Sequence, residues 1–245
     1  MKAQTKNGHR PGDPSTVDSF GACHRVVETR HHTKDRLLEV ATRIFSLRGL
    51  DGTSIRLLVR EAGVNLAAVG YYFSNKEGLY RAVIEQISAA GQAEMTEETE
   101  RVRRALSQKN LSKAQVRNLL HDFVAAFVDL LLSERAAAYI CILNREQMNP
   151  TPAFDILYDR MLRPLHETLT GLVARLTGMP ESTDEAILCA HGILGQAVIF
   201  NTYREAVLRR LKWKAYETHG TQQIVALVQR HTDAIIDSYL LKSQP

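Results

Sequence analysis

The chain has 245 residues, of which 44% are hydrophobic and 24% charged, and its formal net charge is +4. This length and composition fit a globular protein of one or two domains and require no unusual class. The whole positive excess lies in residues 1–90, because residues 91–245 carry eighteen basic and eighteen acidic residues. On its own this asymmetry is a weak indication of nucleic-acid binding.

Several other classes of protein are disfavoured by what the sequence lacks. Cys23, Cys141 and Cys189 form no C-x-x-C pair, so we expect neither a disulfide framework nor a metal site. Neither a signal-peptide core nor an apolar stretch long enough to span a membrane is evident, so we expect a cytoplasmic protein without a membrane partner. We find no catalytic or phosphate-binding motif, and therefore expect neither enzymatic activity nor a cofactor.

Residues 1–30 are rich in Gly, Pro, Ser and Thr and show no sustained periodicity, so we interpret them as a flexible arm. Such an arm can lie in the DNA minor groove beside a helix-turn-helix, or be an unstructured tail. Cys23, His24, His31 and His32 lack a second cluster that would complete a metal site. We expect a first helix from Thr33, as its N-cap, to about Leu47.

A helix-turn-helix is predicted between residues 53 and 76. Apolar residues recur with helical spacing from Ile55 to Ala62, and Gly63 then permits the positive φ of a C-terminal cap. Asn65 is a suitable N-cap for a second helix with Leu66, Val69 and Phe73 turned inward. Its outer face is then small or aromatic, and a B-DNA major groove about 12 Å wide admits such a helix.

A third helix is expected to follow at once. Ser74 and Glu77 have the S-x-x-E spacing of a capping box, which places Lys76 in the first helical turn. A helix N-terminus with a nearby lysine favours phosphate binding. Leu79, Val83, Ile84 and Ile87 would face inward, and the charged continuation to about residue 106 is typical of a solvated helix that joins two bodies.

These residues resemble the DNA-binding domain of the TetR family of bacterial transcriptional regulators. The resemblance covers residues 36–87 and rests on the turn with Gly49, Thr53 and Ser54, on Ala62–Val64, and on the block YYFSNKEGLY at 71–80. Gly70 departs from the family, which usually has a larger residue there that reaches the DNA. It also lowers helix propensity by about 1 kcal/mol relative to alanine.

The resemblance implies which side chains contact DNA. Base contacts would come from the second helix of the motif, and phosphate contacts from its flanks. The implied set is Thr53, Ser54, Arg56, Asn65, Ala67, Ala68, Gly70, Tyr71, Tyr72 and Lys76. For Tyr71 the alternative is packing on a neighbouring helix, and for Lys76 a solvated helix terminus. The face has no arginine to bind guanine, so we expect specificity from thymine methyl contacts and DNA shape.

The rest of the chain is predicted to be helical, which makes the fold all-α. Ser112 would open a helix to Leu132, residues 136–145 would form a shorter one, and residues 149–152 would break the chain. Pro164 would kink the next helix or begin a new one. Two late helices follow, residues 186–204 and 221–240. We expect residues 1–30 to be the arm, 31–90 the DNA-binding domain and 91–245 an effector-binding and dimerisation domain.

In TetR-like proteins the last two helices form a four-helix bundle with a second subunit. The stripe of Ile224, Val228, His231 and Ile235 agrees with that role, and the alternative is that both helices fill the core of a monomer. His231 would meet its symmetry mate or be a satisfied core histidine. The run at 143–152 also resembles the regulatory domain of the CecR-like branch.

The family further implies a pocket for a small-molecule effector of unknown identity. Residues combining a large side chain with a polar tip, or an aromatic ring, are the candidates to line it, although each is more often core or surface. They are His121, Phe127, Tyr139, Arg145, Phe154, His166, His191 and Asn201. His191 stands out because a histidine on an apolar helix needs a partner.

The resemblance implies a homodimeric repressor that binds a palindromic double-stranded DNA operator and is released by its effector. The alternative is a helical adaptor without DNA binding, which would have no reason to keep a cleared helix face between two capped turns.

Overall fold

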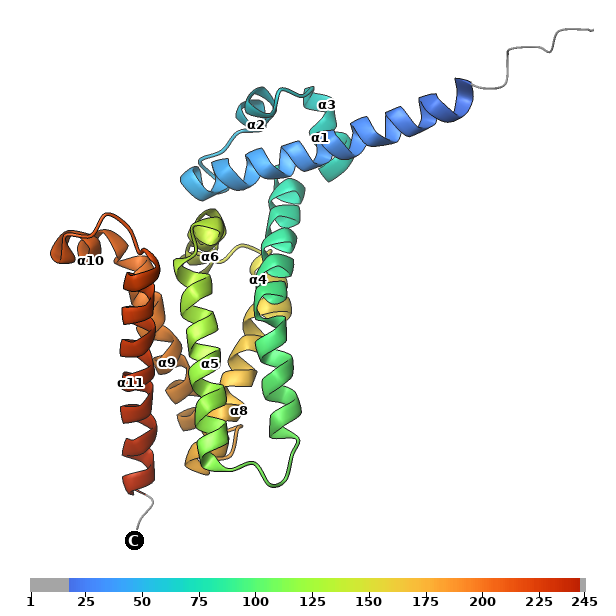
Figure 1. Ribbon diagram of the computed structural model, residues 1–245. Helices are drawn as coiled ribbons and strands as arrows, with labels where there is room; N and C mark the ends of the chain where they lie inside the picture. The colour runs from blue at the N-terminus through green and yellow to red at the C-terminus, as the bar shows by residue number, and fades with distance from the viewer. Residues whose placement is uncertain (1–17, 243–245) are drawn as a thin grey trace, which may run out of the picture.

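The structure is a computed structural model that describes the backbone of residues 18–242 and the side chains of residues 32–241. Those residues form helices joined by short loops and contain no strand, which confirms the all-α prediction (Figure 1). The helices are α1 Asp18–Arg48, α2 Ile55–Ala62, α3 Leu66–Phe73, α4 Lys76–Leu106, α5 Lys113–Leu132, α6 Ala137–Met148, α7 Phe154–Leu157, α8 Arg163–Thr177, α9 Asp184–Thr202, α10 Arg204–Leu211 and α11 Thr218–Lys242.

The N-terminal helices enclose a core of their own. The predicted inner face of α1, from Leu37 to Phe45, is fully buried, as is that of α4, from Leu79 to Ile87. The rings of Phe45 and Tyr80 meet edge to face with centroids 5.0 Å apart, which ties α1 to α4. In Figure 1, α1 lies across the upper end of α4, α2 lies above α1, and α3 passes behind α1.

One predicted helix start and one predicted capping residue are wrong, whereas α4 begins at Lys76 as expected. Helix α1 begins at Asp18 and not after Thr33, so residues 18–30 of the expected arm are helical, and residues 1–17 lie outside the described part. Helix α4 is capped by Asn75, whose side chain accepts a hydrogen bond from the Gly78 amide at 2.7 Å, because Ser74 is itself used as the C-cap of α3 with φ 68°. Leu66 was expected inside but is 55% exposed.

The C-terminal helices form a second core around α5 and α8. Ser112 and Gln115 make a reciprocal capping box at the start of α5, as predicted for Ser112. Helix α8 begins at Arg163, with Pro164 in its first turn where a missing amide costs nothing. A π-helical turn, Tyr158–Leu162, joins α7 to α8. Pro164 therefore lies in the first turn of a new helix and does not kink a continuous one.

The two late helices are partly exposed. Helix α11 already begins at Thr218, so His219 and Gly220 lie inside it and do not separate it from the basic segment. It buries Ile224, Val228, Thr232 and Ile236, whereas His231 is exposed in the single chain. His231 is therefore not a core histidine, and a contact between His231 and its symmetry mate stays a prediction.

Helix α6 lies between the two cores. Its Ile142 belongs to the N-terminal core together with residues of α7, whereas Ile140 belongs to the C-terminal core. The domain boundary expected at residue 90 falls inside α4, which in Figure 1 runs from the N-terminal unit down the length of the C-terminal helices. The division at residue 90 therefore stays a prediction.

Within residues 18–242, no single helix combines the length and apolar content needed to cross a membrane. The pair α9 and α10 meets those criteria only when taken together, and it is bent by 69°.

Candidate DNA-binding face and ligand cavity

Three local features fix the helix-turn-helix: a side-chain N-cap on each helix and a left-handed glycine between the two helices. The Ser54 side chain accepts from the Leu57 amide at 3.2 Å and caps α2, and the Asn65 side chain accepts from the Ala67 amide at 3.0 Å and caps α3. Between them Gly63 has φ 63°, in the left-handed region predicted for it. These caps hold α3 at a defined angle to α2, although each helix has only eight residues.

The outward face of α3 is small and uncharged. Ala67 and Gly70 are exposed, and a Cβ added at Gly70 would meet no atom within 4 Å. Tyr71 is 70% exposed, and its ring touches that of Tyr72 edge to face. Ala68 and Tyr72 are only half-buried and pack against the N-terminal core. Among the expected base contacts, Asn65, Ala67 and Tyr71 are therefore the most accessible.

The residues expected to hold phosphates divide into two groups. Ser54 and Arg56 are exposed beside α3. Thr53 is almost wholly buried and donates its hydroxyl hydrogen to the Gly49 carbonyl at 2.7 Å. Lys76 donates from Nζ to the Leu50 carbonyl at 3.0 Å. In the free chain Thr53 and Lys76 therefore stabilise the loop before α2.

A large cavity of about 1180 Å³ lies among the C-terminal helices, with α4, α5, α6, α8 and α9 contributing to its wall. Four of the eight predicted effector-binding residues line it: Phe127, Tyr139, His166 and Asn201. The Asn201 amide donates to the Leu131 carbonyl at 3.0 Å, which joins α9 to α5.

The other four predicted residues have different places. His121 bonds through Nε2 to Asp233 of α11 at 2.9 Å, and Arg117 bonds to the same carboxylate at 2.6 Å. Burial raises the pKa of Asp233, but the hydrogen bonds from His121 and Arg117 outweigh it and hold that pKa below its usual range. This polar cluster ties α5 to α11.

Phe154, Arg145 and His191 also lie outside the lining. Phe154 packs on the N-terminal core with its ring against Tyr158. Arg145 lies on α6 and donates to the Leu47 carbonyl at the end of α1. His191 donates from Nδ1 to the Ile187 carbonyl of its own helix at 2.9 Å, so the partner expected for it is a backbone oxygen. Its ring touches that of His166, with centroids 4.3 Å apart, so it backs the cavity wall.

Sequence reasoning missed the side of the cavity formed by α4. Gln92, Met95 and Thr99 line it, and Met161 lies against Gly91, where an added Cβ would be 2.2 Å from the Met161 sulfur. The signal in the sequence was the recurrence of uncharged residues along α4 in its otherwise charged second half. We interpreted that half as a solvated connection.

Helix α6 contacts both the cavity and the N-terminal unit. Arg145 donates to the Leu47 carbonyl at 3.0 Å, at the C-terminal end of α1. The Tyr80 hydroxyl of α4 donates to Glu146 at 2.7 Å, and Gln86 of α4 donates to the Tyr139 hydroxyl at 2.9 Å. Burial, and then the hydrogen bond to Glu146, raise the pKa of Tyr80.

Neither a metal site nor a reactive thiol stands out in the described residues. No group of three or more His, Cys, Asp or Glu side chains there is placed to hold a metal ion. Cys23, His24 and His31 have side chains outside the described part. Burial raises the pKa of Cys189, which disfavours its thiolate, whereas Cys141 is exposed on α6.

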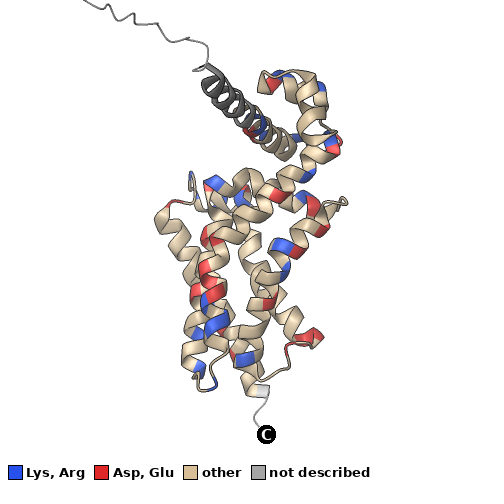
Figure 2. Cartoon of the chain, turned by 90° about the vertical axis from the view of Figure 1, so that its right-hand side faces the viewer, with Lys and Arg blue, Asp and Glu red and all other residues tan. Residues whose placement is uncertain are grey.

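Charge is mixed over the C-terminal helices. In Figure 2, both basic and acidic residues occur along them, in agreement with the equal counts of the two charges in residues 91–245. The feature that distinguishes the N-terminal unit is therefore its geometry: a short, uncharged helix held between two capped turns and exposed on its outer side.

This geometry is typical of a DNA-binding protein with an N-terminal helix-turn-helix and a cavity among its C-terminal helices. Comparison with known proteins agrees. Residues 37–83 match the family model of bacterial regulatory proteins of the TetR family, and residues 116–238 match the model of the C-terminal domain of the HTH-type transcriptional dual regulator CecR. The chain belongs to the TetR family of DNA-binding transcriptional regulators, with a C-terminal domain of the CecR type.

Individual relatives support the assignment. The chain is 29% identical over 210 residues to CecR of Shigella flexneri, covering 86% of this chain and 94% of that protein. It is 33% identical over 52 residues to the IcaR negative transcriptional regulator of Staphylococcus epidermidis, covering 21% and 28% of the two chains.

Solved structures share the fold. A transcriptional regulator from Pseudomonas aeruginosa PAO1 superposes with a TM-score of 0.57 and 17% identity, covering 86% of this chain and 93% of the other. The hemolysin II transcriptional regulator HlyIIR superposes with a TM-score of 0.54 and 20% identity, covering 81% and 97%.

Proposed function

We propose that this regulator is a cytoplasmic repressor that binds a palindromic operator as a homodimer and releases it when a small molecule occupies the cavity. The observation that carries the proposal is the outer face of α3, which is uncharged and exposed to solvent. Among its relatives, IcaR is named a negative regulator and CecR a dual regulator, so repression is the output that both names allow.

Apolar residues on α9 and near the end of α11 support dimerisation. Leu188 is 69% exposed, and Ile187, Ile199 and Leu241 are also exposed to solvent in the single chain. Large exposed apolar side chains that share a surface are typical of an interaction site. Gly192 and Gly195 of α9 are exposed as well, so the helix presents little side-chain bulk there and allows a second helix to approach closely. We propose that α9 and α11 pair with the same helices of a second copy.

In such a dimer the two α3 helices would lie in successive major grooves, about 34–36 Å apart. In this proposal the methyl group of Ala67 would contact a thymine methyl, and Tyr71 would contact a phosphate or base edge. Ser54 and Arg56, both exposed, would fix the position on the backbone. Because α3 carries no charged residue, we expect discrimination to rest largely on thymine methyl groups and DNA shape.

Helices α4 and α6 are placed to connect effector and DNA. The cavity-facing residues Tyr139 and Leu143 lie on the helix whose Arg145 and Glu146 bond to α1 and α4. An occupant that shifts α6 would therefore shift the anchoring of the N-terminal unit and change the α3 spacing. A coupling free energy of 1–3 kcal/mol corresponds to a change in DNA affinity of roughly 5- to 150-fold.

The test is a gel-shift titration of the full chain against its own upstream DNA at several salt concentrations, with the variant Ala67→Glu. A carboxylate on the outer face of α3 would meet the phosphates, so we expect specific binding to be lost. The matched control Ala93→Glu places the same group on an exposed position of α4 and should bind as the natural chain does. Equal affinity of Ala67→Glu and the natural chain would contradict the proposed role of the α3 face, whereas no DNA binding by either would favour the adaptor alternative.

A further inference from the structure

The buried part of the cavity wall carries no charged residue. Eleven of the residues that line the cavity are buried, and all of them are apolar or glycine. They are Ile87, Met95, Val102, Phe127, Leu131, Ala136, Ile140, Leu162, Leu165, Gly171 and Leu194. An occupant that fills the interior is therefore surrounded mainly by hydrocarbon, a methionine sulfur and an aromatic ring.

The charged residues of the lining are at its solvent-exposed edge. Seven of the eight are exposed, and the half-buried Glu100 is paired with Arg103. The full set is Glu94, Glu100, Arg103, Asp129, Arg135, Arg160, Glu167 and Glu181. An ionised group placed in the interior would lose its hydration without gaining a counter-ion, which is strongly unfavourable.

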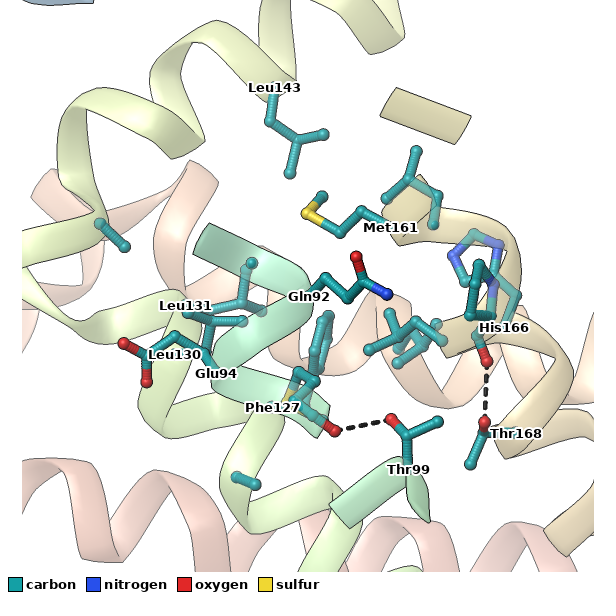
Figure 3. A pocket seen from close by; sticks show the side chains of 18 of the residues that line it. Gln92, Glu94, Thr99, Phe127, Leu130, Leu131, Leu143, Met161, His166 and Thr168 are labelled. Atoms are coloured by element: carbon teal, nitrogen blue, oxygen red, sulfur yellow. Dashed lines mark hydrogen bonds between the residues drawn. The ribbon is translucent and has the colours of Figure 1, made fainter. Parts of the chain in front are cut away.

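Two uncharged polar side chains that reach into the cavity, Gln92 and His166, have no hydrogen bond of their own, unlike two threonines of the lining. Thr99 and Thr168 each donate to a carbonyl of their own helix, the Met95 carbonyl at 2.6 Å and the Pro164 carbonyl at 2.7 Å. By contrast, the amide of Gln92, an exposed residue at the cavity edge, and the ring nitrogens of the half-buried His166 make no hydrogen bond to another described residue. Figure 3 shows both side chains pointing into the pocket, from α4 and α8.

His166 is neutral in this environment. Burial, and then the neighbouring His191, lower the pKa of His166 to about 4. At neutral pH its imidazole therefore has one nitrogen that donates a hydrogen bond and one that accepts. A ligand hydroxyl or carbonyl is the natural complement to such a ring, and leaving the ring unpaired against an apolar body would cost free energy.

We propose that the effector is an uncharged, largely apolar molecule whose hydroxyl or carbonyl group hydrogen-bonds to His166 and Gln92. This inference rests on the proposed function, because it names the chemical class of the occupant of the same cavity. It excludes a fatty acid or an alkylamine whose ionised group must enter the interior.

The experiment uses four eight-carbon probes that differ only at one end: 1-octanol, 1-chlorooctane, octanoate and octylammonium. Each is titrated into the full chain at pH 7.5 by isothermal titration calorimetry. We expect 1-octanol to bind at least about tenfold more tightly than either ion, because only the ions lose hydration in the interior. We also expect it to bind more tightly than 1-chlorooctane, because only the alcohol offers a hydroxyl group to His166.

The variant His166→Phe keeps an aromatic ring and removes both nitrogens. It should abolish the preference for 1-octanol over 1-chlorooctane while both compounds still bind. The matched control His219→Phe, at an exposed position of α11 outside the lining, should keep that preference.

Two results would overturn the inference: an ion that binds as tightly as 1-octanol, or no binding of any of the four compounds. The proposed function is judged separately, by the affinity of the chain for its operator and by whether any bound probe lowers it. An ion that both bound the cavity and released DNA would contradict the chemical class while supporting the effector role.

Discussion

Gly63 and Gly70 stand in the same motif and have opposite effects on its stability. Gly63 holds φ 63°, and a Cβ there would also lie 3.2 Å from the Arg36 guanidinium. Gly70 has a helical backbone and open space where a Cβ would be. One glycine is therefore required by the backbone, whereas the other only weakens α3.

This contrast gives a paired prediction. Gly63→Ala should lower the free energy of unfolding by about 1–2 kcal/mol, the cost of a left-handed non-glycine residue. Gly70→Ala should raise it by about 0.5–1 kcal/mol, through greater helix propensity. Urea denaturation followed by circular dichroism measures both. A Gly63→Ala variant as stable as the natural chain would mean that the turn is not held as described.

His166 makes stability depend on pH. Its pKa is about 4 in the folded chain and about 6.5 when unfolded, so between these values the unfolded chain binds more protons. The contribution of neutral His166 to the free energy of unfolding is complete above pH 6.5 and is lost as the pH falls towards 4. Allowing for partial exposure, we expect a loss of about 2 kcal/mol. Urea denaturation from pH 7.5 to 4.5 measures it, and His166→Phe should lose less than the natural chain.

Helix α6 joins the two cores through hydrogen bonds to α1 and α4. Glu146 is 1% exposed, and its carboxylate accepts from the Tyr80 hydroxyl and from the backbone amide and hydroxyl of Thr151. No cation is paired with it in the described part of the chain, so these hydrogen bonds alone satisfy the buried group. The joint between α4 and α6 therefore depends on each donor.

Tyr80→Phe removes one of those donors and keeps the ring that packs on Phe45. We expect it to lower the free energy of unfolding by about 1–3 kcal/mol, because a buried acceptor is left with fewer partners. The control Tyr71→Phe removes a hydroxyl from an exposed ring and should change stability by less than about 0.5 kcal/mol. Similar values for the two variants would contradict a structural role for the joint.

Much of the fold was predictable from local chemistry. The C-cap at Gly63 and the N-caps at Asn65 and Ser112 follow from residue type and spacing, and the structure has all three. The N-cap of α4 was not predictable in this way, because Ser74 and Asn75 are both good capping residues and only the backbone shows that Ser74 ends α3.

The cavity was harder to predict than the DNA-binding face. A DNA-reading helix is continuous in sequence, so its exposed side follows from its period. The cavity wall combines five helices, and whether a polar residue such as His121 faces it depends on a partner distant in sequence, here Asp233. Tyr139, His166 and Asn201 were identified by residue type, whereas Arg145 and His191 share that type and lie elsewhere.

The whole-molecule proposal is a dimer. A palindromic operator would need two copies of α3, and exposed apolar residues of α9 such as Leu188 are not covered by any other residue in the described part of the chain. The polar cluster of His121, Arg117 and Asp233 holds α11 against α5 and so supports the surface proposed for pairing.

Leu188→Glu should therefore produce monomers, because it places a charge in the proposed interface. Sedimentation velocity should show the natural chain as a dimer and the variant as a monomer. Leu47→Glu is the matched control, since Leu47 of α1 is 68% exposed and Leu188 is 69% exposed, and it should remain dimeric. A dimeric Leu188→Glu variant would place the interface on another surface.

Whether a pair of α3 helices reads a symmetric DNA sequence can be measured by selecting, from random DNA, the duplexes that the full chain binds. We expect an enriched motif of two inverted half-sites whose centres are about one helical turn apart, or a multiple of it, occupied by two copies of the chain. Enrichment of no sequence, or of a single asymmetric site bound by one copy, would contradict it.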